Sequence, residues 1–158
     1  MSYKRLQHNA ENLKRGKSMN NRMICKFSSL SQNESFARSV IGCFILQLNP
    51  SIAELTDVKT AVSEAVTNSI VHGYPDCVGE ITLKAEIING TIHIKIMDRG
   101  IGIENVSDAL EPFYTTKADD ERSGMGFTIM KSFMDTVKVT SKKGKGTKVY
   151  MSKTIIAE

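Results

Sequence analysis

The stretch EITLKAEIINGTIHIKIM, residues Glu80–Met97, decides the fold class. Apolar and polar side chains alternate on both sides of an Asn-Gly pair, so each half has one apolar face. Asn89-Gly90 is the strongest hairpin signal in the chain, because both residue types tolerate the positive φ angles of a type I′ turn. The stretch therefore predicts two antiparallel strands, 80–88 and 91–97, whose apolar face other elements must cover.

Two helices are expected before this hairpin, after a short strand at 23–27. Ser31 or Asn33 can cap the first helix, which is expected to run to about Leu48. Its expected inward-facing side chains are Phe36, Val40, Phe44, Ile45 and Leu48. Asn49-Pro50-Ser51 separates it from a second helix, which is expected to span residues 51–72 and to end at the following glycine.

The elements after the hairpin complete the architecture. We expect a short helix at 105–110, a mobile loop at 111–123, a helix at 124–134 and strands at 137–141 and 147–155. Strands then fall in adjacent hairpins and helices in a group. This order predicts an α/β two-layer sandwich, in which a mixed, mainly antiparallel sheet has three helices on one face.

Composition indicates one soluble globular domain at residues 21–156, after a polar leader at 1–20 that we expect to be disordered. The net charge of the 158 residues is +4. Residues 1–18 hold five basic residues and one acidic residue, so residues 19–158 sum to zero. Because electrostatic nucleic-acid binding needs a basic face on the folded domain, this total argues against a direct nucleic-acid partner.

The cysteines and the lengths of the apolar runs indicate the cellular compartment in which the protein is expected. Cys25, Cys43 and Cys77 fit no zinc motif, and an odd number argues against a disulfide framework. No apolar run is long enough to cross a bilayer, and the N-terminus lacks the apolar segment of a secretion signal. These features predict a cytoplasmic protein with reduced thiols and no membrane partner.

The last part of the second expected helix, within SEAVTNSIVHGY at residues 63–74, carries a polar stripe. In an α-helix, Glu64, Asn68 and His72 are each one turn apart and share a face. A carboxylate one turn before a carboxamide is an unusual pair to place beside a core, so the stripe is a candidate functional site. A solvated stripe on an amphipathic helix is the other interpretation, and the stretch alone does not separate the two.

Two glycine-bearing segments favour a ligand site. Asp98, followed by Gly100 and Gly102, places an acceptor-only carboxylate where a flat ligand can approach, and it would accept from the exocyclic amine of adenine. The segment S-G-M-G, residues 123–126, opens a helix and can expose N–H groups to phosphates, with Lys117 just upstream. An ordinary turn and an ordinary glycine-rich helix entry remain the alternatives.

Taken together, these motifs resemble one family. E-x-x-x-N with H-G-Y, D-x-G-x-G, P-F-Y-T-T-K, S-G-M-G-F and G-K-G-T follow the order of the Bergerat-fold ATP-binding superfamily of gyrase and histidine kinases. Across residues 20–155 the chain is most similar to the anti-sigma factor serine kinases of sporulation. N-E-S-F-A-R from Asn33 and R-S-G-M-G-F-T-I-M from Arg122 add to this resemblance.

The resemblance implies residue roles around ATP or ADP and Mg²⁺. Asn68 would bind the metal ion, Glu64 would act as general base and Asp98 would hold the adenine amino group. The other nucleotide-binding positions implied are Gly100, Gly102, Thr116, Lys117, Ser123, Gly124, Met125, Gly126, Phe127 and Thr147. His72 would either face the nucleotide or serve structurally at the helix end.

The resemblance also implies a reaction and partners. The family phosphorylates a serine of a small anti-anti-sigma protein with ATP, holds a sporulation sigma factor inactive and forms homodimers. Arg38, on the first long helix, would either dock these partners or be a solvated arginine. The competing hypotheses are a sigma-binding module that nucleotide only tunes, without kinase turnover, and an ATPase that needs no protein substrate.

Overall fold

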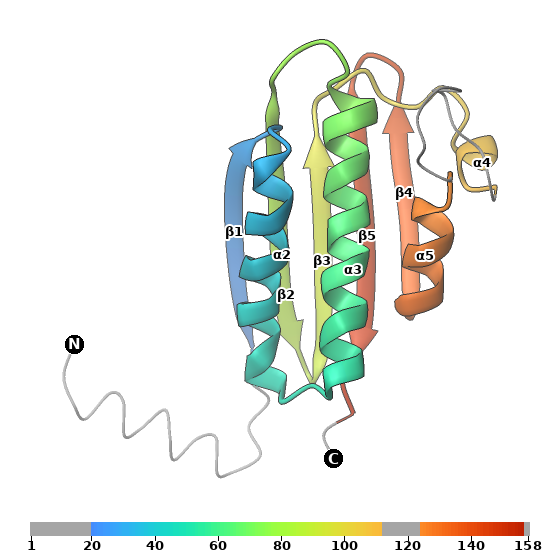
Figure 1. The fold of residues 1–158 in the computed structure, drawn as a ribbon. Helices are drawn as coiled ribbons and strands as arrows, with labels where there is room; N and C mark the ends of the chain where they lie inside the picture. The colour runs from blue at the N-terminus through green and yellow to red at the C-terminus, as the bar shows by residue number, and fades with distance from the viewer. Residues whose placement is uncertain (1–19, 112–123, 157–158) are drawn as a thin grey trace.

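The computed structural model describes residues 20–111 and 124–156, in which helices cover one face of a five-stranded sheet (Figure 1). The strands follow the spatial order β1-β2-β3-β5-β4. Their bounds are β1 Asn21–Ser28, β2 Glu80–Ile88, β3 Thr91–Asp98, β4 Thr136–Lys142 and β5 Gly146–Thr154. All four neighbouring pairs are antiparallel, so the two-layer α/β prediction is confirmed and the sheet is antiparallel rather than mixed.

The central hairpin forms as the sequence predicts. Asn89 and Gly90 have φ angles of 49° and 79°, the positive values of a type I′ turn. Leu83 pairs with Ile96 across β2 and β3, and both side chains are buried. The alternating apolar residues of the two strands therefore form the floor of the core, and their polar neighbours lie on the opposite face.

Helices α2 (Gln32–Ile45), α3 (Ile52–Asn68) and α5 (Gly126–Phe133) lie side by side over this floor (Figure 1). The core side chains of α2 are Ala37, Ile41, Phe44 and Ile45. The prediction that Phe36 faces inward is wrong, because 46% of its surface is exposed and its ring meets Phe27 edge-on, 5.9 Å between centroids. It lies over β1, an edge strand of the sheet, and the described residues include no further strand beyond this edge to cover it.

The shorter elements also follow the sequence closely. A 3₁₀ turn, η1 (Leu46–Leu48), extends α2, and α4 (Val106–Ala109) lies beside the far edge of the sheet (Figure 1). Asn105 caps α4, accepting from the backbone N–H groups of Ser107 and Asp108. In the part of the chain that the structure describes, no helix combines the length and apolarity needed to span a membrane.

The second long helix changes its winding where the polar stripe lies. α3 ends at Asn68 and continues as a π-helical turn, η2 (Ser69–Gly73), in which the Tyr74 N–H donates to the Ser69 carbonyl at 3.1 Å. A π turn advances the chain by more residues per turn than an α-helix. The α-helical spacing therefore holds from Glu64 to Asn68 and does not extend to His72, contrary to the sequence prediction.

The start of α3 carries a capping box. The Ser51 hydroxyl accepts from the Glu54 N–H at 3.2 Å, and Glu54 Oε2 accepts from the Ser51 N–H at 2.8 Å. Glu54 Oε1 also accepts from the Ile156 N–H at 3.2 Å. The hydrogen bond from the Ser51 backbone, helped by that of Ile156, lowers the pKa of Glu54 below its ordinary value of 4.5.

We expect Glu54→Gln to lower the free energy of unfolding at neutral pH by about 1 kcal/mol, because the charged cap is lost. A lowered pKa in the folded state means that this stability is present above 4.5 and disappears as the pH falls through the folded-state pKa. Urea unfolding should therefore show the full difference in unfolding free energy between the two proteins at about pH 7. At about pH 3.5 the difference should be smaller.

Glu86→Gln is the matched control, since Glu86 is an exposed carboxylate on β2. It should change the free energy of unfolding little at either pH. Equal stability of the Glu54→Gln variant and the parent protein at neutral pH would contradict a stabilising role for the cap.

Candidate active site

The start of α5 lies directly on the polar face of α3. A Cβ atom placed on Gly126 would lie 3.1 Å from Glu64 Oε2 and 3.3 Å from Asn68 Nδ2. Both distances are tighter than nine in ten Cβ contacts, so a larger residue here would have to displace the ends of the Glu64 and Asn68 side chains. The structure thus brings together Glu64 and Asn68 with the segment in which the sequence predicted a phosphate site.

The N-terminus of α5 is suited to an anion. Met125, at the N-cap position, makes no side-chain capping hydrogen bond. The first N–H groups of a helix have no intrahelical acceptor, and the helix dipole places positive potential there. Gly124, just before it, has a φ of +62°, which glycine adopts without strain. The arrangement favours a phosphate group at this helix end.

Asp98 lies at the end of β3 with 7% of its surface exposed, and hydrogen bonds fix its carboxylate. Oδ1 accepts from the N–H groups of Gly100, at 3.0 Å, and Thr147, at 3.1 Å. Oδ2 accepts from the hydroxyl of Ser69 at 2.8 Å. A carboxylate held by three donors stays oriented while it accepts a further hydrogen bond.

The loop after Asp98 is fixed between two other elements. A Cβ on Gly100 would lie 2.0 Å from the Gly73 carbonyl oxygen, and one on Gly102 would lie 2.2 Å from the Lys142 carbonyl oxygen. The Ile101 N–H donates to the Gly73 carbonyl at 2.9 Å, and the Ile101 carbonyl accepts from the Gly144 N–H at 2.7 Å. η2 and the β4–β5 turn therefore hold this loop from both sides.

Of the remaining predicted positions, two lie within the described residues and three lie outside them. Phe127, on α5, packs against the core, and the hydroxyl of Thr147 is 2.8 Å from that of Ser141. Thr116, Lys117 and Ser123 lie outside the described residues, as do residues 112–123 of the loop expected at 111–123 and residues 1–19 of the leader expected at 1–20.

Known proteins are similar to this chain in sequence and in fold. A family model described as a histidine kinase-like ATPase domain matches residues 27–153. The anti-sigma F factor of Clostridium acetobutylicum is 54% identical over 135 residues, which are 85% of this chain and 94% of the relative. The chain belongs to the anti-sigma F factor family.

Solved structures agree on the fold of this anti-sigma F factor family member. The RsbU and RsbW domains of a Mycobacterium tuberculosis protein superpose with a TM-score of 0.62 at 15% identity, covering 85% of this chain and 32% of that one. Full-length ShkA in complex with AMPPNP gives a TM-score of 0.52 at 18% identity, covering 66% of this chain and 22% of that one.

Sequence reasoning missed three residues that shape the Asp98 environment of this family member. Ser69 donates to the Asp98 carboxylate, and a Cβ on Gly73 would lie 3.1 Å from Asp98 Cγ. The Tyr74 hydroxyl donates to the Glu80 carbonyl and accepts from the Arg99 N–H, both at 2.8 Å. All three lie within six residues after Asn68, but the sequence could not place them against Asp98, since the π turn that aims them has no periodic signature.

Arg38 lies on the outer face of α2, with 48% of its side chain exposed. Its Nε is 3.8 Å from Glu34 Oε1, and the Ser63 hydroxyl donates to the same Glu34 oxygen. Ser63 directly precedes Glu64 on α3. The exposed surface around Arg38 is thus connected to the helix that carries the candidate base.

Proposed function

We propose that the chain is an ATP-dependent protein serine kinase that phosphorylates a small anti-anti-sigma protein and also binds and inhibits a sporulation sigma factor. The observation that carries the proposal is the position of Glu64. A carboxylate lies one turn before Asn68, directly beneath the N-terminus of α5. The name anti-sigma F factor, borne by the 54% identical relative, supports the sigma-binding part.

In this proposal the nucleotide spans two parts of the site. The adenine amino group would donate to Asp98, and the phosphates would accept from the N–H groups at the start of α5. The AMPPNP complex of the structural neighbour supports nucleotide binding by this fold. Lys117, Ser123 and Thr116, in the segment between α4 and α5, would complete the phosphate contacts.

Asn68 fits a magnesium site completed by substrate. Within residues 20–111 and 124–156, no cluster of three His, Cys, Asp or Glu side chains is arranged to hold a metal ion. Mg²⁺ prefers oxygen ligands, keeps several waters and often binds through one or two protein groups together with phosphate oxygens. One carboxamide oxygen beside the phosphate site suits that pattern. When bound, the ion would neutralise charge on the phosphates.

Glu64 would act as the general base. The carboxylate accepts the proton of the substrate serine hydroxyl while the serine oxygen attacks the γ-phosphorus, and ADP leaves with the electrons of the bridging P–O bond. Positioning matters more than covalent chemistry in this reaction. The close contact between α3 and α5 fixes the base relative to the phosphate site.

The second candidate is a sigma-binding module whose affinity nucleotide merely tunes. Phosphate binding needs only the helix N-terminus and cations, so such a module would have no need of a carboxylate beside the metal ligand. A negative charge near the phosphates would weaken binding. The presence of Glu64 therefore favours the kinase.

The test is incubation of the chain with radiolabelled ATP, Mg²⁺ and a candidate anti-anti-sigma protein, followed by mapping of the labelled residue. We expect label on one serine of the protein substrate and ADP in equal amount. Nucleotide binding without transfer to any candidate would support the module instead. Release of inorganic phosphate at the same rate without protein substrate would indicate an ATPase.

A further inference from the structure

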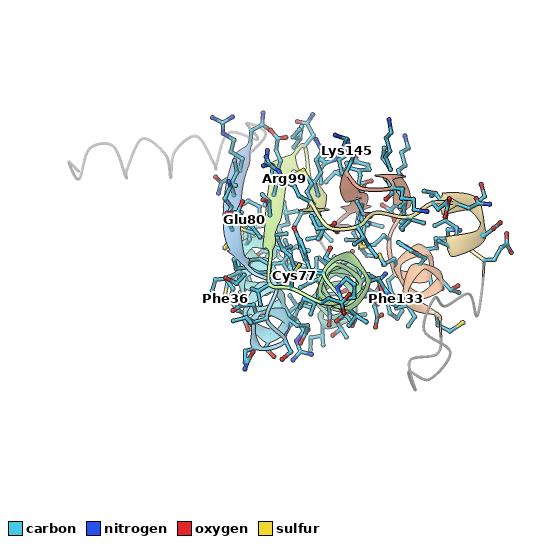
Figure 2. All side chains as sticks on the ribbon, turned by 90° about the horizontal axis from the view of Figure 1, so that it is seen from above. Phe36, Cys77, Glu80, Arg99, Phe133 and Lys145 are labelled. Atoms are coloured by element: carbon cyan, nitrogen blue, oxygen red, sulfur yellow. The ribbon has the colours of Figure 1, made fainter. Side chains whose placement is uncertain are left out.

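The face of the sheet opposite the helices is uncovered and basic. Nitrogen-tipped side chains stand along this face in Figure 2, while the helices lie on the other side. The pleat places seven exposed cations on it and two carboxylates, Glu80 and Glu86. The seven cations are Arg22, Lys26, Lys84, Lys95, Lys138, Lys142 and Lys148. The rest of the described chain holds seven basic and ten acidic residues, so charge is separated between the two faces.

A row across the middle of this face concentrates the positive charge. The strand register places Lys84 opposite Lys95, and Tyr150 opposite both Lys95 and Lys138. Like charges directly opposite one another destabilise a sheet. Within residues 20–111 and 124–156, these three lysines form no ion pair, and Lys26 pairs with Glu80 at 3.1 Å. An anionic partner would relieve this repulsion.

Aromatic rings lie among these cations. His93 on β3 and Tyr150 on β5 are partly exposed and stack at 6.2 Å between centroids and 24° between planes. His93 Nδ1 is 2.8 Å from the Tyr150 hydroxyl. β3 is the middle strand of the five, and β5 is its neighbour. Cations that follow a phosphate backbone, together with aromatic rings on which bases stack, are what single-stranded nucleic acid requires.

The composition of the face disfavours other occupants. A second copy of this chain would place two basic faces together, which like-charge repulsion opposes. Protein interfaces are depleted in lysine at their cores and depend on buried aromatic or arginine anchors, whereas lysine dominates here. Duplex DNA keeps its bases stacked inside, which leaves the aromatic rings without a partner, and the described part of this face has no helix or loop that could enter a groove.

We propose that the uncovered face of the sheet, centred on Lys84, Lys95, Tyr150 and Lys138, binds single-stranded nucleic acid. This binding goes beyond the proposed kinase function and does not depend on it, because Glu64, Asn68 and Asp98 face the helical side. The net charge of residues 19–158 is zero because it adds the basic face to the more acidic rest of the domain. The total therefore does not reveal the basic face.

Fluorescence anisotropy of a labelled oligothymidylate of about 15 nucleotides tests the proposal with the full-length chain. We expect measurable binding that weakens steeply between about 50 mM and about 200 mM salt. The variant Lys84→Gln/Lys95→Gln/Lys138→Gln should bind at least about tenfold more weakly. It should also lower the slope of log affinity against log salt by about 2, since each lost phosphate contact contributes about 0.7.

Two control variants separate this face from the rest of the chain. Lys59→Gln/Lys131→Gln removes cations from the helical side, and its affinity should stay close to that of the parent protein. Tyr150→Leu should weaken binding about tenfold through lost stacking, whereas Tyr150→Phe keeps the ring and should bind normally. All variants retain the basic leader, so binding through residues 1–18 would be the same in each.

Several results would overturn the proposal. These are absence of binding, unchanged affinity in the triple variant, equal affinity for a duplex of the same length, or full competition by an oligoglutamate at equal charge. Thermal unfolding of each variant tests whether a loss of binding results from misfolding. The triple variant should melt at or above the temperature of the parent protein, because it removes a like-charge pair.

Discussion

Glu64→Gln is expected to slow phosphoryl transfer to the protein substrate by about 10²- to 10⁴-fold while nucleotide affinity changes by less than about threefold. The amide keeps the size and shape of the side chain beside Gly126, but it is uncharged and cannot accept the serine proton. Because a general base acts in the transition state, its loss lowers the transfer rate without weakening the bound ground state. Transfer rates with radiolabelled ATP and calorimetric nucleotide titrations measure the two effects separately.

Glu54→Gln is the matched control, since it makes the same chemical change at the other end of α3. It should alter stability but leave the transfer rate near that of the parent protein. An undiminished transfer rate in the Glu64→Gln variant would exclude Glu64 as the base. Lost transfer together with lost nucleotide binding would indicate instead that Glu64 supports the phosphate site structurally.

Asp98→Asn is expected to weaken ATP binding by about 50-fold and to reduce the preference for ATP over GTP. The carboxylate accepts from Ser69, Gly100 and Thr147, and both oxygens act as acceptors. An asparagine can keep its oxygen toward the two backbone N–H groups, but its NH₂ group must then occupy the Oδ2 position. That group would face the amino group of adenine donor to donor, which leaves buried donors unpaired at a cost of about 2–3 kcal/mol.

Ser69→Ala separates the hydrogen-bond network from the carboxylate itself. It removes the hydroxyl donor at 2.8 Å and keeps the charge, so ATP affinity should fall only a few-fold. Calorimetry with ATP and GTP and thermal unfolding of both variants provide the comparison. Unchanged ATP affinity in the Asp98→Asn variant would rule out the adenine contact, and equal losses in both variants would assign the effect to loop structure.

Local sequence patterns were sufficient for most of the fold. Alternation and the Asn89-Gly90 turn specify the central hairpin because the side-chain period of two directly encodes a buried face. The pairing of β4 with β5 was also predictable, since a short turn joins these two strands. The exposure of Phe36 was not predictable, because helical spacing shows which residues share a face and cannot show where the sheet beneath them ends.

The candidate site was predictable as a set of segments but not as an arrangement. D-x-G-x-G and the glycine-rich entry to α5 were recognisable because glycine and carboxylate spacing is local. The hydrogen bonds that hold Asp98 were not predictable, because two of its three donors, Ser69 on η2 and Thr147 on β5, are distant from it in sequence. The π turn that aims Ser69 contacts the loop after Asp98 through the Gly73 carbonyl and has no sequence signature of its own.

The sequence by itself determined the strands, the helices and the family, because each depends on the order and spacing of residue types along the chain. Only the tertiary structure decided that Gly126 rests on Glu64 and Asn68, that Ser69 holds Asp98, and that cations gather on one face of a domain whose charges sum to zero. The physical reason is that contacts and electrostatic potential depend on distance in space. Composition and sequence spacing determine the distance between two residues only when both lie in the same helix or strand.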